Sequence, residues 1–155
     1  AFLPHLHRAD EGHVVNISSV FGLVSIPGQS AYNSAKFAVR GFSDALRMEL
    51  EIEKANVSVT TIHPGGIKTN IVNSGRRDDT VRAIGQDPDD MQDEFDKFAV
   101  SSPEKAARQI LKAVERNRRR ALIGPDAKLF DIASRLPAGL YQRFLITSAQ
   151  RELNR

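Results

Sequence analysis

The sequence predicts an α/β fold in which helices flank a parallel β-sheet. Residues 13–19 are a short, β-branched and apolar run, which is typical of a buried parallel strand, and residues 57–63 read as a second strand. Residues 30–54, which lie between these runs, carry apolar side chains at mostly helical spacing. A strand, a helix and a second strand form a βαβ unit, which is right-handed in nearly all proteins and makes its two strands parallel.

Length and composition are those of one globular domain. The chain has 155 residues, of which 41% are apolar, and its net charge is only +3. No apolar run approaches the roughly 18 residues that a membrane-spanning helix needs. The absence of cysteine excludes disulfides, cysteine nucleophiles and thiolate metal sites. It is also compatible with a reducing cytosol, so we expect a cytoplasmic protein.

The first half of the chain gives the clearest element boundaries. Residues 1–8 are expected to be the tail of a helix, and Gly12 and Gly22 bound the first strand. Ser30 is expected to cap the long helix. The sequence Pro64-Gly65-Gly66 ends the second strand.

The second half is more varied. Residues 67–100 are long and weakly patterned, which predicts a lid loop over a substrate, with short helices inside it. Ser102 and Pro103 begin a helix with Ala106, Ala107, Ile110, Leu111 and Val114 on its buried face, and residues 121–125 read as a third strand. We therefore expect a single domain over residues 1–155, with a core at 1–124 and a helical tail at 125–155 broken at residues 137–139.

Three side chains suggest a proton-transfer site. Tyr32 and Lys36 are four residues apart on the predicted helix, so they share one face. Ser19, thirteen residues before the tyrosine, lies at the end of the first strand, where parallel sheets bind ligands. An ammonium beside a phenol favours the phenolate, which suits a general acid or base near neutral pH. A serine that donates to the same oxygen would help polarise a carbonyl.

Each of these signals also has a structural reading. A Tyr-Lys pair at this spacing occurs by chance in many helices, and a Ser-Ser pair after a strand is often only a turn signal. The combination of both with the Pro64-Gly65 turn and the βαβ spacing favours a catalytic interpretation.

Three stretches together resemble the short-chain dehydrogenase/reductase family. They are Asn16-Ile17-Ser18-Ser19, then Tyr32-Asn33-Ser34-Ala35-Lys36, then His63-Pro64-Gly65-Gly66-Ile67-Lys68-Thr69, in the family's order and spacing. The resemblance covers residues 1–124. It implies a Rossmann-like sheet and an NAD(P)-dependent oxidoreductase that interconverts an alcohol and a carbonyl.

The resemblance also implies a role for each matched residue. Tyr32 would be the catalytic acid/base, Ser19 would orient the substrate oxygen, and Lys36 would favour the phenolate and hold the nicotinamide ribose. The implied cofactor contacts for NAD(H) or NADP(H) are Tyr32, Lys36, Pro64, Gly65, Ile67 and Thr69.

Several family features are missing from the sequence. It has no G-x-G-x-x-G turn, no Asn-Asn-Ala-Gly stretch, and no residue that chooses NAD or NADP. The expectation is therefore that the chain is the C-terminal part of such an enzyme, without the N-terminal nucleotide-binding βαβ units and inactive alone. The alternative is a non-catalytic fragment or association module that cannot bind the dinucleotide.

The remaining motifs indicate which other ligands and partners to expect. The four histidines do not form a metal pattern, so no metal site is predicted. Residues 116–120 are basic but lack an aromatic platform, so we expect no nucleic-acid partner. We favour a tail that covers the substrate pocket or a subunit contact over one on a membrane surface. The small residues Ala38, Gly41 and Ala45 share a helix face on which another helix could pack, which suggests a homo-oligomer. Four apolar residues near the expected cleft suggest an apolar substrate: Val24, Ile26, Ile71 and Val72.

Overall fold

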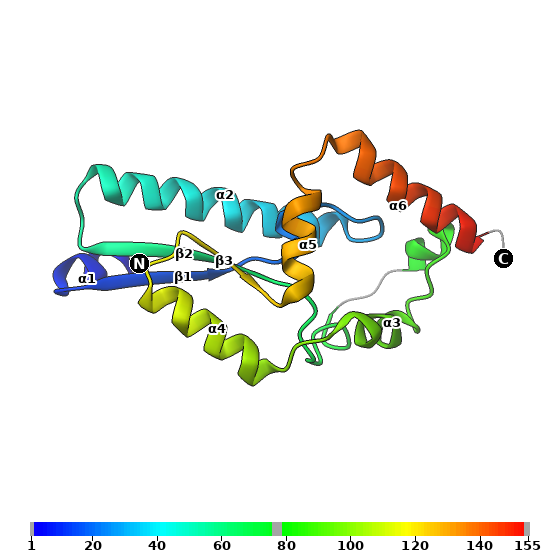
Figure 1. Cartoon of the computed structure of the whole chain (residues 1–155), viewed down its shortest axis with the longest axis horizontal. Coiled ribbons are helices and arrows are strands. Elements are labelled where there is room, and N and C mark those ends of the chain that lie inside the picture. The colour runs from blue at the N-terminus through cyan, green and yellow to red at the C-terminus, as the bar shows by residue number, and fades with distance from the viewer. Residues whose placement is uncertain (1, 76–78, 154–155) are drawn as a thin grey trace.

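The computed structural model describes residues 2–75 and 79–153. Its centre is a three-stranded parallel sheet of order β1-β2-β3, formed by Gly12–Ile17, Val57–Pro64 and Arg120–Ile123. The long helix α2 (Ser30–Ile52) lies on one face of the sheet and α4 (Pro103–Glu115) on the other (Figure 1). The predicted α/β fold with a parallel sheet and flanking helices is confirmed.

Strand register brings the carboxyl ends of the strands to one edge. Strand β1 pairs with β2 from Gly12↔Val57 to Ile17↔Ile62, whereas β3 pairs only with the last part of β2, from Thr61↔Arg120 to Pro64↔Ile123. The turns that follow all three strands are therefore neighbours.

The central strand β2 separates two small apolar cores. Val57 and Val59 pack with Leu50 of α2 on one face. Ile62 packs on the other face with Ala106 of α4 and Ile123 of β3. Because strand side chains alternate between faces, the odd-numbered Val57 and Val59 face α2, and the even-numbered Ile62 faces α4. Burial on both faces is expected of a central strand, and in β2 it also includes the polar side chains of Thr60, Thr61 and His63.

Helix α2 begins as predicted but without the predicted cap. Gln29 occupies the N-cap position and makes no side-chain capping bond, while Ser30 is already helical. A cap residue needs a non-helical backbone, and Gln29 has φ −127° and ψ 36°. The expectation that Ser30 caps this helix is therefore wrong. A shorter helix, α1 (Leu3–Arg8), precedes β1.

Helix α4 begins with the predicted cap but presents a different face. The Ser102 hydroxyl accepts the backbone N–H of Lys105 at 3.3 Å. Ala106 and Ala113 are buried, whereas Ala107 is exposed and Leu111 is 61% exposed. The buried stripe is narrower than predicted because α4 covers only the β2–β3 side of the sheet.

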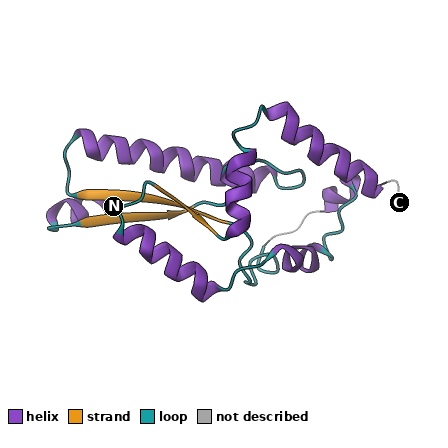
Figure 2. Cartoon of the chain, viewed as in Figure 1, coloured by secondary structure: helices purple, strands orange, loops and turns teal. Residues whose placement is uncertain are grey.

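The remaining segments lie beyond the carboxyl ends of the strands. They are a 3-10 turn at Asp79–Ile84 and helices α3 (Met91–Phe98), α5 (Pro125–Ala133) and α6 (Ala138–Leu153), as Figure 2 shows. The predicted lid over 67–100 thus contains two short helical pieces, and its residues 76–78 lie outside the described part. The tail forms helices, as predicted, but two boundaries differ from the prediction. Pro125 begins α5 instead of ending the third strand, since proline suits the first turn of a helix. The break lies before Ala138, because Ala138 and Gly139 already belong to α6. Across the described ranges, no helix has the length and apolar character to cross a membrane.

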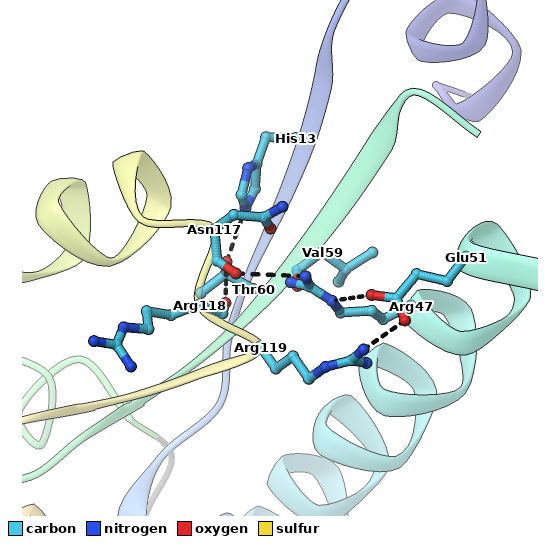
Figure 3. A network of polar contacts seen from close by, with 8 residues as sticks. All are labelled: His13, Arg47, Glu51, Val59, Thr60, Asn117, Arg118 and Arg119. Atoms are coloured by element: carbon cyan, nitrogen blue, oxygen red, sulfur yellow. Dashed lines mark hydrogen bonds and ion pairs between the residues drawn. The ribbon is translucent and has the colours of Figure 1, made fainter. Parts of the chain in front are cut away.

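A buried arginine connects α2 to the sheet and to the turn before β3. Arg47 donates to the carbonyl of Val59 at 2.6 Å and to that of Asn117 at 3.4 Å, and it pairs with Glu51 (Figure 3). Thr60 donates to the carbonyl of Arg118 at 2.6 Å. These bonds fix the start of β3, which is too short to be held by its ladder alone.

Candidate active site

Ser19 stands where the chain leaves strand β1. The last ladder bond runs from the Ser18 N–H to the Ile62 carbonyl at 2.8 Å. Ser19 is extended and caps a 3-10 turn, Val20–Gly22, through its hydroxyl, which accepts the Phe21 N–H at 3.1 Å. Because the hydroxyl oxygen accepts this bond, its own hydrogen is left to donate to another group.

Tyr32 and Lys36 lie on the same face of the first turns of α2, as their spacing predicts. The Lys36 ammonium is 5.3 Å from the centre of the Tyr32 ring and donates to the Ile17 carbonyl at 3.2 Å. The Tyr32 ring packs edge-on against Phe21, with ring centres 6.3 Å apart. Lys36 therefore contacts Ile17, two residues before Ser19, and Tyr32 contacts Phe21, two residues after it.

Gly22 and Ser18 set the distance between this turn and α2. The Ser18 hydroxyl donates to the Lys36 carbonyl at 2.8 Å. A Cβ on Gly22 would lie 2.3 Å from the Ser18 hydroxyl and 2.7 Å from the Lys36 carbonyl oxygen. Only glycine therefore allows this close approach. The sequence indicated Gly22 as a strand boundary and missed its role beside the helix.

The Pro64-Gly65-Gly66 turn lies under the start of α5. The Gly65 N–H donates to the Ile123 carbonyl at 2.9 Å, and the Gly66 N–H donates to the Asp126 carboxylate at 2.6 Å. A Cβ on Gly65 would lie 2.0 Å from that carboxylate. Asp126 therefore belongs to the candidate site, although the sequence placed it only in the helical tail at 125–155.

The two remaining predicted cofactor residues follow this turn. Ile67 forms a parallel bridge with Ser101, and the next N–H, of Lys68, donates to the Ser101 carbonyl at 2.9 Å. Thr69 is exposed. Among the hydrogen bonds of the described residues, none joins Thr69 to Ser19 or Tyr32.

His63 is a buried neighbour of Ser19 whose partner the sequence did not reveal. It is 0% exposed, and its Nδ1 is 2.7 Å from the Ser19 carbonyl oxygen. Burial lowers the pKa of His63, and the bond to the Ser19 carbonyl opposes this effect.

One residue of the predicted substrate surface lies elsewhere. Val24 is 2% exposed and belongs to the core, together with Val20 and Leu23 from the same 3-10 turn and its end. Ile71 is 54% exposed, and Ile26 and Val72 are half-buried.

Comparison with known proteins gives a consistent result. Residues 1–80 match the family model described as short chain dehydrogenase. The chain is 47% identical over 146 residues to a Mycobacterium tuberculosis protein named as an oxidoreductase, SadH. The match covers 94% of this chain and 51% of the relative, so the chain spans about half the length of that curated protein.

Two crystal structures share the fold. A short chain dehydrogenase/reductase from Burkholderia phymatum, in complex with NAD, aligns with a TM-score of 0.72 at 22% identity, over 91% of this chain and 52% of the other. One from Burkholderia cenocepacia, in complex with NADP, gives 0.68 at 19% identity, over 94% and 51%. At these identities the likeness extends to the fold alone.

Proposed function

Because the chain belongs to the short-chain dehydrogenase family, we propose that the full-length protein interconverts an alcohol and a carbonyl with NAD(H) or NADP(H). One observation carries the proposal. Tyr32 and Lys36 share a face of α2, and that face meets the turn that holds Ser19. This meeting point is the carboxyl edge of a parallel sheet, where such folds bind ligands.

In the reductive direction, the Tyr32 phenol gives its proton to the carbonyl oxygen of the substrate. The Ser19 hydroxyl donates to the same oxygen, because its own oxygen already accepts from Phe21. Two donors stabilise the negative charge that develops there. In the oxidative direction, Tyr32 takes the proton from the alcohol.

The residues of the site fit the nicotinamide-ribose end of a dinucleotide. Lys36 carries three N–H donors and uses one on the Ile17 carbonyl, so the others suit ribose hydroxyls. The cofactor, when bound, supplies or accepts the hydride that no side chain can provide. Pro64, Gly65, Ile67 and Thr69 are proposed to line its nicotinamide and phosphates. The two fold relatives carry NAD and NADP respectively, and we propose one of these two for this protein.

An apolar substrate remains part of the proposal. Ile26, Ile71 and Val72 retain accessible surface on segments beyond the strand ends, while Val24 does not.

A second candidate function is association without catalysis. Ile17 and Phe42 are 47% and 63% exposed and would favour contact with another chain.

An isotope experiment tests the reaction class. The full-length protein is incubated with NADH or NADPH that carries deuterium at C4 of the nicotinamide, and with a panel of apolar aldehydes and ketones. We expect alcohols one mass unit heavier, with the deuterium on the former carbonyl carbon.

Calorimetric titration of each cofactor into the full-length protein separates catalysis from association without catalysis. Absence of both cofactor binding and deuterium transfer would favour association and contradict the proposal.

A further inference from the structure

His63 is a buried histidine to which the proposed reaction assigns no role. It lies at the carboxyl end of β2, directly before Pro64, and its side chain reaches across to the chain that leaves β1. The His63 Nδ1–H donates to the Ser19 carbonyl at 2.7 Å, and the Gly22 N–H donates to the same carbonyl at 3.0 Å. The backbone of Ser19 is thus held from two directions.

The backbone ladder cannot provide this link. Its last bond joins the Ser18 N–H to the Ile62 carbonyl. The following donor position on β2 with the same orientation is Pro64, which has no N–H. The His63 side chain is therefore the connection between β2 and the chain just beyond the end of the β1–β2 ladder.

Resting on the function proposed above, we infer that His63 is a positioning residue: it fixes the Ser19 backbone, and so the Ser19 hydroxyl, relative to Tyr32. A carbonyl oxygen can only accept, so the imidazole carries its hydrogen on Nδ1. Ser19 is 7% exposed and is followed at once by the 3-10 turn that contacts the Tyr32 ring through Phe21. Displacement of its carbonyl would move the hydroxyl and this ring contact together.

The surroundings of His63 keep the ring neutral. Its Nε2 is buried and lacks a hydrogen-bond partner within the part of the chain that the structure describes. A second proton would therefore be buried without an acceptor. Burial is the main cause of the lowered pKa; Arg120 of β3 and Arg40 of α2 lower it further, while Asp44 raises it. The neutral ring therefore carries its single hydrogen on Nδ1, where the Ser19 carbonyl accepts it, and leaves Nε2 without one.

Two substitutions of similar polarity separate positioning from packing. In His63→Asn the side-chain amide N–H₂ can stand near the place of Nδ1, whereas in His63→Gln it reaches toward the place of Nε2. His13→Gln is the matched control, because His13 lies on the same sheet and donates to the Thr60 hydroxyl at 2.8 Å, without contact to Ser19.

The first readout does not depend on activity. Nitrogen-15 NMR of the full-length protein should show the Nδ1-protonated tautomer for His63. Amide exchange at Phe21 and Gly22 should accelerate about tenfold or more in His63→Gln, and should stay close to wild type in His63→Asn and His13→Gln. An Nε2-protonated tautomer, or equal exchange in the two His63 variants, would overturn the inference.

The second readout is a double-mutant cycle with Ser19→Ala. We expect His63→Gln to lower kcat about tenfold or more with an unchanged KM for the cofactor, since small displacements of a catalytic group are costly. In the Ser19→Ala background the same change should alter kcat less than about twofold. An equal effect in both backgrounds would overturn the positioning role alone. A Ser19→Ala variant with wild-type kcat would overturn the proposed function and the inference with it.

Discussion

At the scale of single residues, Asp126 is the contact that joins the C-terminal segment to the candidate site. One carboxylate oxygen accepts the Gly66 N–H at 2.6 Å. Gly65 and Gly124 leave the space for this carboxylate, since a Cβ on either would come within 2.0 Å and 2.6 Å of it. The aspartate therefore fixes the turn that is proposed to lie beside the nicotinamide.

Substitutions at Asp126 should show how much this bond stabilises the protein. Asp126→Ala leaves the Gly66 N–H without its charged acceptor, and we expect a loss of about 1.5–3 kcal/mol in the free energy of unfolding. Asp126→Asn keeps an acceptor oxygen and should lose less. Chemical denaturation of the full-length protein measures both. Asp79→Ala, which removes an exposed pair with Arg82, is the control and should leave the free energy of unfolding nearly unchanged. Equal losses in the two alanine variants would refute this role.

The sequence could predict that Tyr32 and Lys36 share a helix face near Ser19, because this relation is local. Helix geometry alone puts the first two on one face, and a strand end places the serine nearby. Asp126 lies 60 residues from its partner Gly66, and nothing in the local pattern joins them. The partner of His63 depends in the same way on the register of β1 and β2. Such contacts follow from tertiary structure, which spacing cannot supply.

At the scale of elements, the two helices that cover the faces of the sheet, α2 and α4, start in different ways. The Ser102 hydroxyl accepts an N–H in the first turn of α4, whereas no side chain caps the start of α2. The residue types would suggest equal caps, since both helices have a serine at the predicted position. The backbone angles decide the outcome, because Ser102 is extended and Ser30 is helical.

Alanine substitutions distinguish the two serines. Ser102→Ala should lower the free energy of unfolding by about 1 kcal/mol, the usual contribution of an N-cap bond. Ser30→Ala should be neutral or slightly stabilising, because alanine is the better helix former. Thermal or chemical unfolding of both variants checks this. A similar loss in Ser30→Ala would mean that its hydroxyl does cap α2.

Most elements were predictable from sequence, and their buried faces were less so. Strand β2 ends at Pro64, and α4 starts at Pro103, as proline chemistry predicts. Leu111 is exposed although it lies in an apolar pattern, because the short β3 gives α4 a narrow surface to cover. The periodicity of apolar residues predicts which face of a helix is buried, but it cannot predict how wide a surface of the sheet that face will cover.

At the scale of the whole molecule, one apolar surface is open on β1 and α2. Ile17 and Phe42 are 47% and 63% exposed, and they line a shallow hollow with Ala38 and Val39. Among the described strands, β1 pairs only with β2. The predicted homo-oligomer remains a prediction, and this surface is where we expect contact with another part of the protein or another copy.

A charge on this surface should reduce association. Phe42→Glu would bury a carboxylate in any contact made there, which is costly without a partner. We expect the full-length variant to shift toward smaller species in light scattering at equal concentration. Leu111→Glu on α4 is the control, because Leu111 is about as exposed as Phe42, at 61%, but lies on the opposite face of the sheet from α2. If the two variants assemble alike, the surface is not a subunit contact.

The most direct test of the central claim is turnover of Tyr32→Phe in the full-length protein. The substitution removes only the phenolic oxygen, and Tyr141→Phe on α6 is the matched control, since the chain has two tyrosines. Loss of the acid/base should lower kcat by about 10²- to 10⁴-fold, while the Tyr141 variant stays near wild type. Wild-type turnover in Tyr32→Phe would contradict the assignment of the site.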